Sequence, residues 1–179
     1  MITRIEQRMI DEGISAFTQY DMNILIVRIS EKIGKLPYEI TADVILQHHK
    51  NLKINILADL CEEEIIKGFK ATNGHFYRTN RDDQINMIGQ KDVLNTDPNV
   101  EETVLWKTED TGYVSHTKDE WLKVYAEAFE HKKNQLLKYN ELKTKIISAT
   151  THEEVVNTDW VADNNQQAPT ETVSQYPEG

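Results

Sequence analysis

The densest group of residues that could do chemistry lies at 68–90, GFKATNGHFYRTNRDDQINMIGQ, with a histidine, a tyrosine, two arginines and two aspartates beside an Asn-Gly turn. Asp82 and Asp83 could act as a pair of carboxylates in acid–base catalysis. Neighbouring residues of a helix point about 100° apart, however, so the two side chains would not converge on one substrate. Their position in the first turn of a predicted helix, where the helix dipole favours anions, is the simpler explanation.

Metal and nucleophile chemistry find little support elsewhere in the chain. His48 and His49 are adjacent on a predicted helix and cannot chelate one ion together. Cys61 lies on the apolar stripe of that helix and is followed by three glutamates, which would raise its thiol pKa and suit a structural role. No Gly-rich phosphate loop or G-x-S-x-G motif occurs. We therefore expect no catalytic residue, no metal and no cofactor. None of the six histidines lies in an H-E-x-x-H pattern: His48, His49, His75, His116, His131 and His152.

Composition limits the classes of function further. The 179 residues include 20 Lys and Arg against 30 Asp and Glu, a net charge of −10, which disfavours binding to nucleic-acid phosphates. No run approaches the roughly 18 apolar residues of a membrane span, and the first residues lack the apolar stretch of a signal peptide. One cysteine excludes an internal disulfide framework and favours folding in a reducing cytoplasm.

The elements that would position these residues are mostly helices. Thr3 and Glu6 predict a capping box for a first helix that ends at Gly13. The apolar run in 21–34 is compatible with a strand, but Asp21 as cap and Gly34 as stop favour a helix. A linker around Pro37 and a long helix over 43–67 follow.

The second half alternates between hairpins and helices. Asn73-Gly74 predicts a hairpin over 69–78, followed by a short helix that Thr79 or Asn80 caps and that ends at Ile88. A loop is expected over 90–102, and Asp110-Thr111-Gly112 predicts the tip of a second hairpin over 103–116, packed on the first. Val104 and Trp106 should share one face of that hairpin, with Leu105 on the other.

Capping boxes at Thr117/Glu120 and Thr151/Glu154 begin the last two helices, the first of them reaching about Ser148. The longer one is expected to lose its apolar stripe over 130–135. Its predicted stripe consists of Trp121, Tyr125, Phe129, Leu136, Tyr139 or Leu142, and Ile146.

The predicted fold class is α+β, predominantly helical, with one or two small β-hairpins and a long C-terminal helix. We expect an N-terminal helical extension at 1–37, an α+β domain at 38–160 with Trp160 as a buried anchor, and a disordered tail at 161–179.

The order of motifs from about residue 50 to 160 resembles an uncharacterised domain family encoded in tailed-bacteriophage genomes, often beside tail-fibre or baseplate genes. Two of the motifs that carry the resemblance are HTKDEW, at the start of the long helix, and IISATTHEEVVNTDW, at its end. It implies a virion or virion-assembly protein and brings no catalytic residues. Its structural signature is carried by Gly68, Phe69, His75, Tyr77, Asp83, Gln84, Asn86, Trp106 and Trp160.

This resemblance leads to a functional hypothesis. The expected role is that of a phage tail or baseplate accessory protein that binds a tail-fibre or receptor-binding protein, as a chaperone or an attachment subunit. Other baseplate proteins are further partners, and the expected location is the host cytoplasm during assembly and then the virion tail. A purely structural baseplate subunit and a small cell-wall-acting hydrolase are the alternatives. The long helix should overhang the core, which makes four of its residues candidates for partner binding: Leu136, Leu137, Tyr139 and Leu142.

Overall fold

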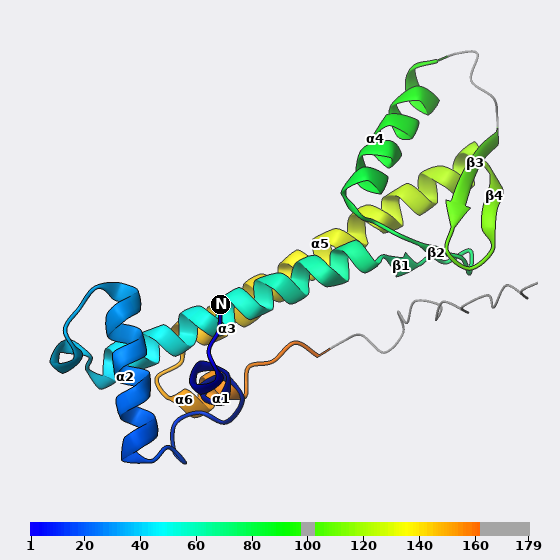
Figure 1. The fold of residues 1–179 in the computed structure, drawn as a ribbon. Helices are drawn as coiled ribbons and strands as arrows, with labels where there is room; N and C mark the ends of the chain where they lie inside the picture. Colours follow the sequence, from blue (N-terminus) through cyan, green and yellow to red (C-terminus); the bar gives the residue numbers. More distant parts are fainter. Residues whose placement is uncertain (98–102, 162–179) are drawn as a thin grey trace, which may run out of the picture. The chain divides into compact units, whose positions relative to one another are not determined.

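A computed structural model describes residues 1–97 and 103–161, and it confirms the α+β class with mostly helical structure (Figure 1). Two compact units contain the described residues. The first unit holds Met1–Cys61 with Leu137–Val161, and the second holds the described part of Glu62–Leu136. This grouping differs from a division at residues 37 and 160, because α3 and α5 each contribute residues to both units. The elements are α1 (Arg4–Glu12), α2 (Gln19–Ile33), the 3₁₀ turn η1 (Pro37–Glu39), α3 (Ala42–Lys67), β1 (Phe69–Lys70), β2 (Phe76–Tyr77), α4 (Arg81–Thr96), β3 (Thr103–Thr108), β4 (Gly112–Thr117), α5 (Lys118–Ser148) and α6 (His152–Val156).

Local capping signals position the first two helices. The predicted capping box of Thr3 and Glu6 is present at the start of α1. The run at 21–34 is helical, but its predicted cap was wrong: Thr18 is the N-cap and Asp21 is the third helical residue. The Thr18 hydroxyl accepts from the Asp21 amide, and the Asp21 carboxylate accepts from the Thr18 amide, so α2 begins earlier than predicted. Gly34 ends α2 in the left-handed conformation, as expected.

The first unit buries two hydrophobic clusters. Met9, Leu25 and Ile29 lie at the centre of one, which joins α1, α2 and the start of α3. Leu57 and Ile146 lie at the centre of the other, which joins α3, the end of α5, and α6. Both clusters consist entirely of first-unit residues.

Two antiparallel hairpins form the β-structure of the second unit, as predicted. Phe69 pairs with Tyr77 across β1–β2, and Trp106 pairs with Val114 across β3–β4. The hairpins pack together, because the Glu109 amide donates to the Phe76 carbonyl at 2.9 Å. Along β3, Val104 is buried, Trp106 is half-buried and Leu105 is exposed, which confirms the predicted faces.

Helix α4 is about twice as long as the sequence predicted. Asn80 caps it, but the helix continues through Gly89 to Thr96, so the expected end at Ile88 and loop at 90–102 were wrong. Met87 and Leu94 lie two turns apart on one face and are both buried, so their packing supports the second half of the helix. The rest of the expected loop, residues 98–102, lies outside the described residues.

Helix α5 runs without a break from Lys118 to Ser148, as predicted, and its middle is buried although the apolar stripe is lost there. Ala128, His131 and Gln135 take the buried positions there, while Phe129 is 60% exposed. His131 Nε2 donates to the Glu64 carbonyl at 3.1 Å, one of the last carbonyls of α3, which lack intrahelical partners. A polar side chain thus supplies a buried contact that an apolar-stripe rule does not recognise.

Candidate functional site

The backbone of Gly68 closely approaches the backbone of Tyr77, beside the buried ring of Phe69. Gly68 has φ +97°, and a Cβ added there would lie 2.1 Å from the Tyr77 carbonyl oxygen. Phe69 is buried beside it and stacks on both Tyr77 and His131. Only glycine fits this position without displacing backbone.

A chain of hydrogen bonds, buried except at Asn73, runs through the two hairpins. The Asn73 amide donates to the Tyr77 hydroxyl at 2.8 Å, and this hydroxyl donates to His116 Nε2 at 2.6 Å. His116 Nδ1 in turn faces the Val104 carbonyl at 3.3 Å and donates to it. Burial raises the pKa of Tyr77. The chain ends on backbone, so these side chains fix the hairpins relative to each other.

His75, Asp110 and Thr111 have the residue types of a hydrolase triad but not its geometry. His75 Nδ1 lies 2.9 Å from Asp110 Oδ2 and 3.2 Å from Thr111 Oγ1. Activation of a hydroxyl requires the carboxylate and the hydroxyl at opposite ring nitrogens, whereas here both lie at Nδ1. Asp110 also accepts from the Phe76 amide at 2.9 Å, so the cluster holds the tip of β3–β4 on β2.

Three further signature residues, Asp83, Asn86 and Trp106, line a pocket of about 470 Å³ in the second unit, here called the polar pocket. Asp83, Asn86 and Gln90 lie on one face of α4 at helical spacing. Gln84 points elsewhere, and its amide donates to the Thr79 carbonyl at 2.7 Å. The other lining residues are Arg78, Leu105, Lys107, Glu109 and Tyr113.

Arg78 organises the charges of the polar pocket. Its guanidinium lies 3.8 Å from Asp83 Oδ2 and 3.2 Å from Glu109 Oε1. Burial raises the pKa of Asp83 and outweighs the lowering effect of Arg78. The residues that line the polar pocket come from three separate segments of the chain. Their spacing in the sequence therefore did not predict that they would meet.

The histidines of the first unit pair with groups far away in the sequence. His48 Nε2 lies 2.8 Å from Glu6 Oε1, and His49 Nδ1 lies 2.9 Å from His152 Nδ1, with the latter two rings stacked. His48 and His49 face different partners, as predicted, and Cys61 is buried. Within the described ranges, no group of three or more His, Cys, Asp or Glu residues could hold a metal ion.

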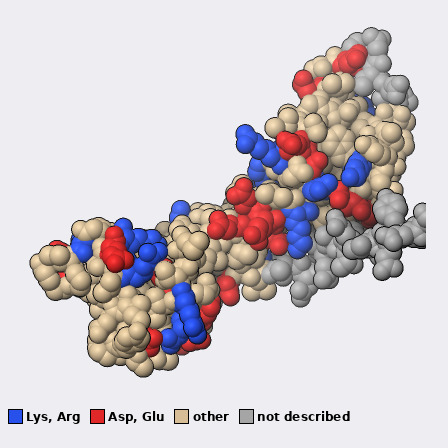
Figure 2. Space-filling model, viewed as in Figure 1, with Lys and Arg blue, Asp and Glu red and all other residues tan. Residues whose placement is uncertain are grey.

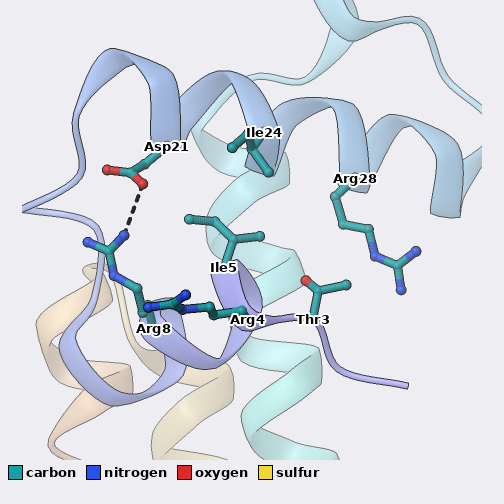
Figure 3. Close-up of a pocket in the computed structure, with 7 residues that line it drawn as sticks. All are labelled: Thr3, Arg4, Ile5, Arg8, Asp21, Ile24 and Arg28. Atoms are coloured by element: carbon teal, nitrogen blue, oxygen red, sulfur yellow. Dashed lines mark hydrogen bonds and ion pairs between the residues drawn. The ribbon is translucent and has the colours of Figure 1, made fainter.

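A second pocket, of about 530 Å³, lies between α1 and α2 in the first unit (Figure 3). The Arg8 guanidinium lies 2.9 Å from Asp21 Oδ1 and over the Phe17 ring. Arg28 Nε lies 3.5 Å from Glu6 Oε2. Arg4 is exposed and has no hydrogen-bond or ion-pair partner among residues 1–97 and 103–161.

The same pocket continues into an exposed apolar stripe. Tyr20, Ile24 and Val27 follow one another at helical spacing on α2 and are 73%, 40% and 47% exposed. Leu25 and Ile29 occupy the buried face of that helix. The clue in the sequence was that α2 is apolar on more than one face, which a helix with a single buried face does not need. We call Arg4, Arg8, Arg28, Tyr20, Ile24 and Val27 together the α1–α2 surface.

The four leucine and tyrosine positions expected to bind a partner on α5 do not form one exposed surface. Leu136 and Leu137 are 48% and 58% exposed. Tyr139 and Leu142 are half-buried against the cluster of Leu57 and Ile146, because the end of α5 is part of the first unit's core.

Trp160 packs on the same cluster but is only half-buried, so its predicted full burial was wrong. The Lys138 ammonium also lies over its ring, 4.8 Å from the centroid, so the indole contacts a cation as well as the apolar cluster.

A comparison with family models identifies the matched part of the chain. Residues 48–162 match the model described as "Domain of unknown function (DUF4376)". The chain belongs to the DUF4376 family. No curated protein and no solved structure matches it. The DUF4376 match includes every residue of the polar pocket and begins after the α1–α2 surface. In the described ranges, no helix has the length and apolarity needed to cross a membrane.

Proposed function

We propose that this protein is a binding subunit that attaches to an acidic, partly apolar segment of another protein through the α1–α2 surface. The observation that carries the proposal is the presence of Arg4, Arg8 and Arg28 around the exposed Ile24 in one pocket (Figure 3). Guanidinium groups bind carboxylates through paired hydrogen bonds and remain charged at all physiological pH values.

The three arginines differ in whether they already have an ion-pair partner in the fold. Arg8 and Arg28 are held in place by Asp21 and Glu6, so little side-chain freedom is lost when a carboxylate approaches them. Arg4 has no partner among the described residues, so it can pair without breaking an existing contact. Together they create a local excess of positive charge on a chain whose net charge is −10.

The apolar stripe gives the second part of the binding energy. Tyr20, Ile24 and Val27 have the spacing that accepts the apolar face of an extended or helical partner segment. Burial of apolar surface contributes about 25 cal/mol per Å², whereas the arginines select an acidic partner and its orientation. On the face drawn in Figure 2, basic and acidic side chains lie among broad areas that carry no charged side chain.

The motif order that resembles the phage-encoded family makes a tail-fibre or receptor-binding protein the first partner to test. In that setting the protein would act as a chaperone during assembly or as an attachment subunit in the virion tail or baseplate. Stoichiometric presence in purified virions supports attachment, whereas presence only in a complex from infected cells supports a chaperone.

The test is co-expression with a candidate tail-fibre protein, followed by size-exclusion chromatography and an affinity measurement. Arg4→Glu and Ile24→Glu should each weaken binding by about tenfold or more, and binding should weaken as salt rises. The matched controls are Arg81→Glu and Ile88→Glu on α4, which are also exposed and should bind as the wild type does.

Wild-type affinity in both α1–α2 variants would overturn the proposal. Loss of binding in Leu137→Glu, with Arg4→Glu unaffected, would assign the partner to the exposed leucines of α5 instead. Circular dichroism of each variant checks that the helices are retained.

A further inference from the structure

The polar pocket offers two side-chain amides that the fold does not use. Asn86 and Gln90 line it from successive turns of α4, and neither has a hydrogen-bond partner within the described ranges. A side-chain amide places a donor and an acceptor side by side. Such a pair can serve two neighbouring hydroxyl groups of a ligand at once.

The charges of the polar pocket balance one another. Arg78 and Lys107 contribute two positive charges, and Asp83 and Glu109 contribute two negative ones. Arg78 lies near both carboxylates, which still keep lone pairs for further donors. A phosphate would meet two carboxylates and a cation would meet two basic groups, so the pocket favours a neutral polar ligand.

Aromatic and aliphatic side chains form the remaining wall. Trp106 is held by stacking on the buried Trp121, with ring centroids 4.3 Å apart. Tyr113 and Leu105 are 71% and 65% exposed on the other face of the same hairpin. Rigid aromatic rings next to hydrogen-bonding groups suit a ligand with an apolar face and polar edges. The volume of about 470 Å³ falls in the range of small-molecule sites.

We infer that the polar pocket binds a neutral saccharide. The amides of Asn86 and Gln90 and the carboxylate of Asp83 bond its hydroxyls, while the exposed ring of Tyr113 packs against the C–H face of a sugar ring. This site is independent of the proposed function, since it lies on the second unit and within the matched family residues.

The experiment titrates the full-length protein with three neutral oligosaccharides, maltohexaose, cellohexaose and chitohexaose, followed by calorimetry and amide NMR shifts. At least one should bind saturably with a Kd between about 1 μM and 1 mM. Asn86→Ala and Gln90→Ala should each weaken that binding by about fivefold or more, and Tyr113→Ala should do the same. The matched control is Asn95→Ala, another exposed amide of α4 that does not line the pocket.

Absence of saturable binding for all three sugars up to about 10 mM would overturn the inference, as would binding that Asn86→Ala and Gln90→Ala leave unchanged. Binding of anionic oligogalacturonate but not of the neutral sugars would also overturn it. Arg4→Glu should leave saccharide binding unaltered. A failure of the saccharide inference can therefore be distinguished from a failure of the α1–α2 proposal.

Discussion

Among the glycines that the structure describes, Gly68 leaves the least room for a side chain. Its φ is +97°, and the Tyr77 carbonyl oxygen would lie 2.1 Å from an added Cβ, so there is no room for a side chain. We expect Gly68→Ala to lower the free energy of unfolding by about 2–4 kcal/mol, because backbone has to move. Urea denaturation of the two proteins measures this difference.

The control for that prediction is Gly89→Ala. Gly89 lies inside α4, and nothing lies within 4 Å of an added Cβ. Alanine there should raise the free energy of unfolding by up to about 1 kcal/mol, the usual difference in helix propensity. Equal destabilisation by the two substitutions would contradict the special role of Gly68.

Glu6 is a fully buried carboxylate whose pKa is lowered to about 2. Burial alone would raise its pKa, but hydrogen bonds from Thr3 and His48 and the charge of Lys32 outweigh it. The unfolded chain takes up the proton near pH 4.5 and the folded chain only near pH 2. The stabilisation from ionised Glu6 is therefore complete above pH 4.5 and is lost as pH falls toward 2.

We expect this loss to amount to about 3 kcal/mol, because the pKa falls from 4.5 in the unfolded chain to about 2 in the fold. Glu6→Gln should be less stable than the wild type at pH 6, and this difference should shrink as pH falls from 4.5 to 2. Chemical denaturation at several pH values measures this difference in the free energy of unfolding. The other carboxylates are the same in both proteins, so their contributions cancel when the two are compared. A difference that stays constant over this range would refute the assignment.

At the scale of elements, the sequence correctly predicted the features that are determined by residues close together in the chain. The capping boxes at Thr3, Thr117 and Thr151 were predicted correctly, since each needs only residues three positions apart. The length of α4 and the burial of the middle of α5 were not, because Leu94 and His131 are fixed by packing on distant segments. Hydrophobic periodicity reports apolar faces and does not recognise a buried histidine.

The candidate sites were harder to predict than the elements. Asp83, Asn86 and Trp106 were selected only as a signature, and their meeting in the polar pocket depends on the packing of α4 beside β3–β4. Arg4 and Arg28 come together through the crossing of α1 and α2, which no local pattern specifies.

Helix α6 should respond to pH through the pair His49 and His152. Burial, then the charges of His152, Lys53 and His48, lower the pKa of His49 to about 4, and burial lowers that of His152. Both rings are neutral in the fold at pH 7, with one Nδ1 donating to the other. The unfolded chain protonates near pH 6.5, so stability from the neutral pair is lost as pH falls from 6.5 toward 4.

We expect amide protection of α6 to decrease over this range, after correction for the intrinsic exchange rate, because protonated rings repel each other. Hydrogen exchange with mass spectrometry measures it. His49→Gln cannot take up a proton there and should remove most of the pH dependence. An unchanged dependence in that variant would show that other groups control α6.

At the scale of the whole molecule, the two proposed sites belong to different parts of the chain. The α1–α2 surface precedes the matched family residues, whereas the polar pocket lies within them. A segment that precedes a family domain can bind a partner of its own without altering the polar pocket of that domain. The partner-binding proposal concerns the first site, and the saccharide inference concerns the second.

Separate cores lead to the last prediction. The cluster around Trp121 contains only second-unit residues, and those around Met9 and Leu57 contain only first-unit residues. Contiguous buried clusters often open as cooperative units. Gly68→Ala should therefore reduce amide protection in β1, β2 and α4 and leave α1 and α2 nearly unchanged.

Met9→Ala is the reciprocal variant, because Met9 is fully buried in the first unit. It should lower protection in α1 and α2 by removing core volume and spare the two hairpins. Hydrogen exchange on both variants at one pH gives the comparison. If each substitution lowers protection evenly along the chain, α3 and α5 transmit the loss and the cores unfold as one cooperative unit.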